Sequence, residues 1–320
     1  AIINWVKQRY DLIVTKEVIN FVPGIVPGIG MAMNCFTQKG DKVMIQPPVY
    51  HPFAWVTTRN ERTLVINPLR WENGMYRMDL DAFREQIKGC KLFILCNPHN
   101  PGGVVWTEAE LRAIADICYD EKVLVFSDEI HADLTLPPHT HRPFATVSEK
   151  ARMNSVTFMS PSKAFNMPGL SASHALIFNE DLRKRFRIYM DAGELDMGHV
   201  FAFLSVEAAY SHGTEWLDQC LAYIQGNIDF VDEFLKKHAP KIKAIRPEAS
   251  YLVWLDCREL ELSQKDLNEF FVDKAHLALN DGEMFGKEGI GFMRLNVASP
   301  RCIIEKAMKQ LADAYQLYIK

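Results

Sequence analysis

Apolar residues follow two alternating patterns over the first two-thirds of the chain. Short, continuously apolar runs predict buried strands at 18–22, 42–46, 62–66, 91–95, 123–127, 155–159 and 174–178. Between these runs the apolar residues recur every three or four positions, which predicts helices near 26–37, 52–59, 79–88, 107–120, 180–191 and 199–212. Several strands are apolar at every position, which is typical of strands buried on both faces. The pattern therefore predicts a three-layer α/β fold with a mostly parallel sheet between helices.

The pattern changes after residue 213. A long helical stretch at 214–238 is followed by strand-like runs at 242–246, 251–255, 276–279 and 291–297, with helices near 263–274 and 301–319. We therefore expect a large domain at 1–213 and a smaller α+β domain at 214–320. Ala1 already stands at the edge of an amphipathic pattern, so we also expect a further N-terminal segment to precede it.

Composition narrows the function classes. The formal net charge of −4 and the absence of a basic run argue against nucleic-acid binding. No apolar run is long enough to span a bilayer, and no secretory signal pattern opens the chain. The seven cysteines are scattered without a C-x-x-C pair, which predicts reduced thiols in a cytoplasmic protein. No metal site is expected at His139 and His141, because no acidic or thiol partner is near them in sequence.

One lysine stands where a buried strand ends. Lys163 lies in the stretch 160–166, directly after the apolar run 155–159 and between Ser162 and Ala164. An ammonium group is costly in an apolar interior unless it is paired or converted. An imine with an aldehyde cofactor such as pyridoxal 5′-phosphate (PLP) is one such conversion. By itself the stretch fits a surface lysine in a Ser/Pro loop equally well.

Two further stretches could bind a phosphate. Gly24, Ile25 and Val26 lie between the strand 18–22 and the next helix, where backbone N–H groups can hold an anion. The spacing is not that of the dinucleotide fingerprint, and it also fits an ordinary helix entry. The hydroxyl groups of Ser160 and Ser162 could complete such a site.

Ligands of open α/β sheets bind beyond the carboxyl ends of the strands, so the residues that follow each strand matter most. Tyr50 follows 42–46 in a proline-rich turn and could stack on a flat ring, although it could equally cover the sheet end. Asn97 follows 91–95 within two Asn-Pro steps, and its amide could donate to a phenolate oxygen. Asp128 follows 123–127 and needs a cationic partner, which a protonated pyridinium would supply. Arg294, within the strand 291–297, could clamp a substrate carboxylate.

These strand ends, taken in chain order, resemble the fold-type I PLP enzymes of the aspartate aminotransferase superfamily over essentially the whole chain. The resemblance implies that Lys163 forms the Schiff base with PLP and that Asp128 partners the pyridine nitrogen. It further implies that Asn97 contacts the ring hydroxyl and the substrate, Tyr50 stacks on the ring as a second catalytic residue, and Arg294 binds the α-carboxylate. The phosphate would be held by the backbone at Gly24, Ile25 and Val26 with Ser160 and Ser162.

Two departures from the aminotransferase pattern indicate which branch of this superfamily the chain resembles. Aminotransferases of this group carry an arginine eight residues after the lysine, where this chain has Ser171, and a tyrosine where it has His131. His131 is accordingly assigned to cofactor binding. The stretches Pro-Pro-Val-Tyr, Cys-Asn-Pro-His-Asn-Pro, Ser-Asp-Glu-Ile-His and Leu-Asn-Asp-Gly resemble the MalY/PatB branch of cystathionine β-lyases.

This branch implies α,β-elimination from cystathionine or another cysteine S-conjugate, in a homodimer with active sites at the interface. An aminotransferase on the same fold and a PLP-bearing regulator that binds a partner protein remain open alternatives. A nucleotide-binding Rossmann enzyme is disfavoured, because the fingerprint is missing and it has no use for Asp128, Lys163 and Arg294.

Overall fold

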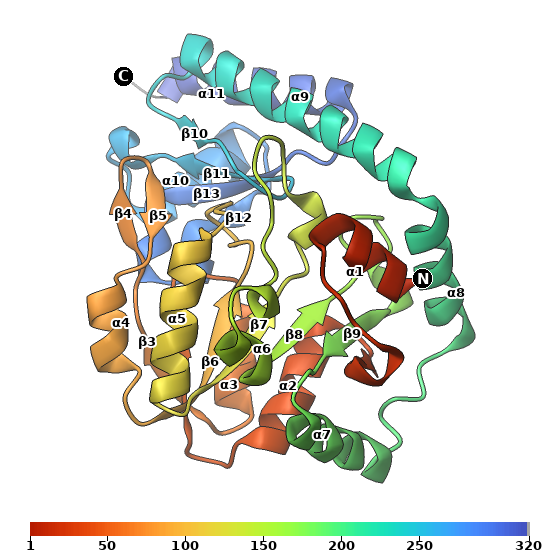
Figure 1. Cartoon of the computed structure of the whole chain (residues 1–320). Coiled ribbons are helices and arrows are strands. Elements are labelled where there is room, and N and C mark those ends of the chain that lie inside the picture. The colour runs from red at the N-terminus through yellow and green to blue at the C-terminus, as the bar shows by residue number, and fades with distance from the viewer. Residues whose placement is uncertain (319–320) are drawn as a thin grey trace.

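The computed structural model describes residues 1–318, and a seven-stranded sheet forms its centre (Figure 1). Its strands are β1 (Ile19–Val22), β2 (Lys42–Ile45), β3 (Thr63–Ile66), β6 (Cys90–Cys96), β7 (Leu124–Asp128), β8 (Ser155–Met159) and β9 (Ser173–Leu176). The spatial order is β1-β9-β8-β7-β6-β2-β3. Neighbours from β8 to β3 are parallel, whereas β9 runs antiparallel to both β8 and β1. The predicted mostly parallel sheet is confirmed.

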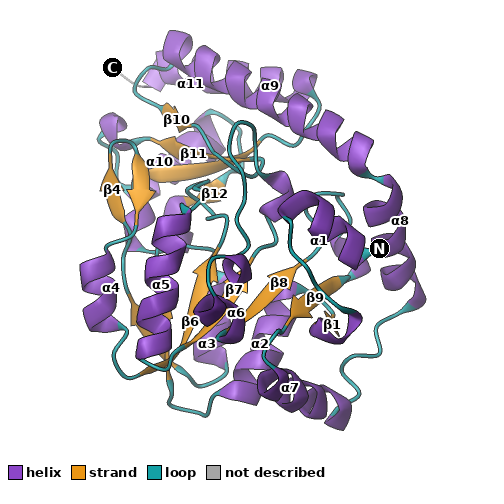
Figure 2. Ribbon diagram, in the orientation of Figure 1, coloured by secondary structure: helices purple, strands orange, loops and turns teal. Residues whose placement is uncertain are grey.

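Helices cover both faces of this sheet (Figure 2). One face packs against α4 (Leu80–Gln86), α5 (Glu108–Asp120) and α6 (Glu149–Met153), and the other against α2 (Ile25–Phe36), α3 (Pro52–Arg59) and α7 (Glu180–Ala192). Along β6, Phe93 and Leu95 point into the first core, while Leu92 and Ile94 point into the second. Because side chains of a strand alternate between faces, burial on both sides requires an apolar residue at every position.

A second sheet is built from the C-terminal part of the chain. It contains β10 (Lys243–Ile245), β11 (Leu252–Asp256), β13 (Phe292–Asn296) and β12 (Asn280–Asp281), in that spatial order and all antiparallel. Val253 and Leu295 share a core with α9 (Thr214–His238) and α11 (Arg301–Tyr318), which run side by side over this sheet (Figure 1). Trp254 and Phe292 instead pack toward the first unit, against Trp71 and Tyr76.

Besides shifts of one or two residues at element ends, the structure differs from the predicted strands in two places. The predicted strand at 276–279 is wrong, because the Leu277 N–H donates to the Phe271 carbonyl (2.8 Å) and so closes the preceding helical segment. That segment consists of α10 (Gln264–Glu269) and a π-helical turn at Phe270–Lys274. The hairpin of β4 (Arg70–Glu72) and β5 (Met75–Arg77) was not predicted, although its Asn-Gly turn at 73–74, with φ of 51° and 81°, is a strong hairpin signal. The last residue of the predicted helix 301–319 lies outside the described residues.

Two further helices complete the chain: α1 (Ile2–Tyr10) and α8 (Val200–His212). The Trp5 ring of α1 stacks on the Tyr210 ring of α8, with centroids 4.7 Å apart. Within residues 1–318, no helix is long and apolar enough to cross a membrane.

Candidate active site

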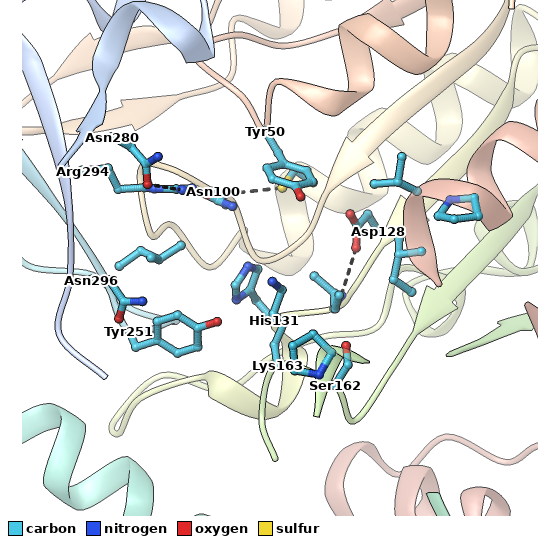
Figure 3. A pocket seen from close by; sticks show the side chains of 17 residues that line it. Tyr50, Asn100, Asp128, His131, Ser162, Lys163, Tyr251, Asn280, Arg294 and Asn296 are labelled. Atoms are coloured by element: carbon cyan, nitrogen blue, oxygen red, sulfur yellow. Dashed lines mark hydrogen bonds between the residues drawn. The ribbon is translucent and has the colours of Figure 1, made fainter. Parts of the chain in front are cut away.

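A cavity of about 370 Å³ lies where the carboxyl ends of the parallel strands face β13 (Figure 3). Parallel strands bring the residues that follow them to one edge of the sheet, which is why positions far apart in sequence meet here. Eight of the predicted site residues line the cavity: Ile25, Val26, Tyr50, Asp128, His131, Ser162, Lys163 and Arg294. Gly24, Asn97 and Ser160 are not among the lining residues.

Lys163 occupies the turn after β8, and its side chain stands beside His131 in the cavity (Figure 3). Burial, and after it the charge of Arg294, lowers the pKa of the Lys163 ammonium, while Asp128 acts in the opposite direction. No carboxylate within residues 1–318 lies within 4.0 Å of its nitrogen. A lysine in this state has a larger neutral fraction near pH 7 than an exposed one, and only the neutral amine is a nucleophile or a base.

Asp128 ends β7 and is only 3% exposed. Its Oδ1 accepts the backbone N–H of Ile130 at 3.1 Å, and no basic side chain of residues 1–318 forms an ion pair with it. Burial raises the pKa of this carboxyl from 3.8 to about 7. A buried carboxylate without a cation is costly, so a cationic N–H placed against it by a ligand would be stabilised strongly.

His131 and Tyr50 stand on two walls of this cavity. His131 is 4% exposed and its Nδ1 has no hydrogen-bond partner. Burial, followed by the charges of Lys163 and Arg294, lowers the pKa of His131 to about 3, so its imidazole is neutral at pH 7. Tyr50 is partly buried, and burial raises the pKa of its phenol. Both side chains therefore present neutral polar groups to a bound molecule.

The structure places part of the predicted phosphate site at the cavity wall: Ile25, Val26 and Ser162 line it, whereas Gly24 and Ser160 do not. Gly24 caps α2 with a φ of 135°, a left-handed value that favours glycine, and so begins the helix whose first residues, Ile25 and Val26, line the cavity. The first N–H groups of a helix have no intrahelical partner and attract anions. Ser162 also lines the cavity. Ser160 is not a lining residue: its hydroxyl donates to the Ala172 carbonyl (2.7 Å) and accepts the Ser162 N–H (3.1 Å), which shapes the turn. Its part in phosphate binding stays a prediction.

Of the two asparagines that precede a proline after β6, Asn100 lines the cavity and Asn97 does not. Asn97 is fully buried, and its side-chain amide donates to the Arg142 carbonyl at 3.1 Å. Its backbone N–H still donates to the Asp128 carbonyl (2.9 Å), which continues the sheet beyond β6. The chain turns only after this point, and Asn100 then faces the cavity and accepts a hydrogen bond from Arg294. Within residues 1–318 the Asn97 Oδ1 is buried without a hydrogen-bond partner, and the assignment of Asn97 to ligand contact stays a prediction beside the observed position of Asn100.

Arg294 projects from β13 into the cavity (Figure 3). Its two terminal nitrogens donate to Asn100 Oδ1 and Asn280 Oδ1, each at 2.8 Å, and its carbon Cζ lies 4.6 Å from the centre of the Phe285 ring. Burial lowers the pKa of Arg294 to about 10, so it is cationic at pH 7. Within residues 1–318 no carboxylate pairs with it, so the guanidinium can bind the carboxylate of a ligand.

Among the lining residues that were not predicted, four carry a hydroxyl or amide group: Asn100, Tyr251, Asn280 and Asn296. The second Asn-Pro step carried the signal for Asn100, but the spacing did not distinguish it from Asn97. Tyr251 directly precedes β11 and Asn296 ends β13, so both stand at strand ends of the second sheet. Asn280 belongs to β12, which begins directly after the predicted strand at 276–279.

Three other residues noted in the sequence lie outside the cavity. Ser171 is exposed at a left-handed φ of 48°. His141 is buried, and its Nε2 lies 2.8 Å from the Glu129 carboxylate, whereas His139 lies 3.7 Å from the Glu248 carboxylate at the surface. Among the cavity-lining residues that the structure describes, Lys163 and Arg294 are the only cationic side chains.

Comparisons with known proteins agree with this geometry. Residues 1–311 match the family Aminotransferase class I and II. Cystathionine beta-lyase PatB of Bacillus subtilis (strain 168) is 38% identical over 316 residues, which are 98% of this chain and 82% of that protein. A PLP-bound putative aminotransferase from Clostridium difficile 630 superposes with a TM-score of 0.96 at 40% identity, covering 98% of this chain and 81% of that one.

Cystalysin from Treponema denticola, whose crystal structure contains a pyridoxal 5′-phosphate cofactor, also superposes with a TM-score of 0.96. It is 34% identical, and the match covers 98% of this chain and 80% of that one. The resemblance read from the strand ends is thereby confirmed. This chain belongs to the aminotransferase class I and II family.

Proposed function

We propose that this protein is a PLP-dependent carbon–sulfur β-lyase. It cleaves the Cβ–S bond of an L-cysteine S-conjugate such as cystathionine and, with one water, releases a thiol, pyruvate and ammonia. The observation that carries the proposal is the convergence of Lys163, Asp128 and Arg294 in one cavity. Relatives named cystathionine beta-lyase from Bacillus subtilis and Corynebacterium glutamicum support the choice of reaction.

The residues present fit PLP. Asp128 is a buried carboxyl without a cation, as a pyridinium partner requires, and the N-terminus of α2 with Ser162 suits a phosphate. Tyr50 would stack on the ring, and His131 and Asn100 would lie around it. When bound, PLP supplies an aldehyde that reacts with amines and an electron sink for the substrate α-carbon.

The protein's own groups then have distinct tasks. Arg294 binds the α-carboxylate and thereby fixes the orientation of the substrate. Lys163 would hold the cofactor through its amine. Because burial lowers the pKa of Lys163, its amine can be neutral and accept the α-proton of a bound substrate. Asp128 would face the pyridine nitrogen and favour its protonated form.

The cavity lining favours a lyase over an aminotransferase that uses a dicarboxylic acceptor. Such an acceptor carries a second carboxylate and needs a second cation, yet Lys163 is occupied by the chemistry and the described lining offers only Arg294 besides it. Holoenzyme given L-cystathionine should release pyruvate and homocysteine without any keto acid. A requirement for 2-oxoglutarate would contradict the assignment. The variant Lys163→Ala should lose the visible cofactor absorption and reduce turnover by at least about a thousandfold.

A homodimer and a cytoplasmic location are also part of this proposal. Large apolar side chains are exposed on and before α8, including Met197, Phe201 (67% exposed) and Leu204, and a second copy would bury them. All seven cysteines are free, which suits a reducing compartment. Sedimentation should give twice the chain mass, and Phe201→Glu should shift it toward the monomer.

A further inference from the structure

Within residues 1–318, the hydrogen-bond and ring partners of the Arg294 guanidinium are all neutral side chains. Asn100 reaches one terminal nitrogen from the loop after β6, and Asn280 reaches the other from β12. The Phe285 ring lies against it, and Nε is buried without a partner. Amide oxygens satisfy two of about five N–H donors without neutralising the charge.

The register of β12 decides which side chain faces the arginine. Asn280 pairs with Arg294, and the next residue, Asp281, pairs with Met293. Because adjacent side chains of a strand point to opposite faces, Asp281 points away from Arg294. Its carboxylate is held there by the side-chain amides of Gln264 (2.5 Å) and Asn268 (2.6 Å). A slip of one residue would exchange the amide for a carboxylate.

We propose that Asn280 is a positioning residue that orients Arg294 while leaving its charge available, so that the site selects ligands with a free α-carboxylate. This inference rests on the proposed function, in which Arg294 binds the substrate carboxylate. A carboxylate at position 280 would pair with the guanidinium and compete with the substrate. An apolar residue there would leave one side of the guanidinium without its hydrogen bond.

The test compares three variants of the holoenzyme. Asn280→Asp should raise the KM for a cysteine S-conjugate about tenfold while kcat changes less than about twofold, which corresponds to loss of ground-state and transition-state binding alike. Asn280→Ala should raise KM by about threefold, since it removes one partly exposed hydrogen bond. Asn296→Asp is the matched control: it adds the same charge to the same cavity, but its Oδ1 position is engaged by the Ala298 N–H (2.9 Å). Its effect on KM should be smaller than that of Asn280→Asp.

A binding measurement separates this inference from the proposed reaction. Propionate carries a carboxylate and no reactive group, and its binding to holoenzyme can be followed by saturation-transfer NMR without turnover. Asn280→Asp should weaken propionate binding about tenfold. Equal binding by the parent and Asn280→Asp, or equal weakening by Asn296→Asp, would overturn the role of Asn280. If no S-conjugate is cleaved by the parent, the lyase assignment fails, while the propionate series still decides the role of Asn280.

Discussion

Asp128, the last residue of β7, and Asp133, in the 3-10 helix 132–134 that follows, are two buried aspartates with opposite surroundings. They are 3% and 4% exposed, and burial raises the pKa of both carboxyls. Asp133 Oδ1 accepts hydrogen bonds from the Trp5 indole (3.0 Å) and from the Tyr10 hydroxyl, both on α1. Asp128 faces the cavity, and from the described residues 1–318 its side chain accepts one hydrogen bond, donated by the backbone N–H of Ile130.

The difference shows that burial and a raised pKa do not by themselves identify a functional carboxyl. Asp133 accepts hydrogen bonds from α1 and so fastens the N-terminal helix, whose Trp5 also stacks on Tyr210 of α8. Asp128 has acceptor capacity left, and that capacity is directed at a cavity. What separates a structural aspartate from a functional one here is which partners are already present.

Asp128→Asn gives the largest expected effect on this comparison. The variant keeps the shape of the side chain but cannot stabilise a cationic ring nitrogen, so kcat for an S-conjugate should fall by about a hundredfold or more. Stability should be retained, because a buried unpaired ionisable group is removed. Turnover and the urea unfolding midpoint, measured on the same preparation, check both statements. A fall in the midpoint with unchanged turnover would make Asp128 a structural residue like Asp133.

Asp133→Ala should show the reverse behaviour. It leaves the Trp5 indole and the Tyr10 hydroxyl without their acceptor, so the free energy of unfolding should fall by about 3 kcal/mol. Turnover per folded molecule should change little. Asp133→Asn is the matched control, since it keeps an acceptor oxygen for the same two donors and should cost less. Denaturant unfolding of the two variants decides; equal losses would show that the charge of Asp133, and not its acceptor, matters.

The pH dependence of apoprotein stability sharpens the comparison further. The pKa of Asp128 is about 7 in the folded protein and near 3.8 in the unfolded chain, so between these values the folded state binds more protons. Stability from this group is therefore fully present below pH 3.8 and is lost as pH rises toward 7, by at most about 1.4 kcal/mol per pH unit. Urea titrations between pH 4.5 and 7 should give a less negative slope for Asp128→Asn than for the parent. Identical slopes would contradict the raised pKa.

The smallest expected effects come from the two asparagines after β6. Asn100→Ala removes a hydrogen bond to Arg294 and should raise the KM by about fivefold with little change in stability. Asn97→Ala removes the bond to the Arg142 carbonyl and should cost about 1 kcal/mol of stability with KM nearly unchanged. Steady-state kinetics and thermal unfolding of this pair test which of the two asparagines serves ligand binding, and the opposite result would assign that role to Asn97.

The α/β pattern and most of the candidate site could be predicted from the chain. Apolar runs predicted all seven strands of the large sheet. In central strands such as β6 and β8 the run reflects burial on both faces, whereas the edge strand β3 is exposed at Thr63 and Ile66. The residues that follow or lie within these strands include four of the predicted site residues: Lys163, Asp128, Tyr50 and Arg294. The division of the chain near residue 213 into two domains stays a prediction.

Other features depended on contacts that leave no local signal. The direction of the chain after β6 decided that Asn100, and not Asn97, reaches the cavity. The hydrogen bond that closes the segment after α10 moved the short strand from 276–279 to β12, and the register of β12 then placed Asn280 beside Arg294.

The sequence by itself determined the layered fold and the mostly parallel sheet. It also determined that a lysine, an aspartate, a tyrosine and an arginine stand after or within its strands. Only the tertiary structure decided that Asn100 faces the cavity, that Asp128 keeps free acceptor capacity, and which side chains surround Arg294. The physical reason is the distance along the chain between interacting residues. The burial pattern depends on neighbouring residues, whereas the partners of a side chain come from distant segments that meet only when the two sheets pack together.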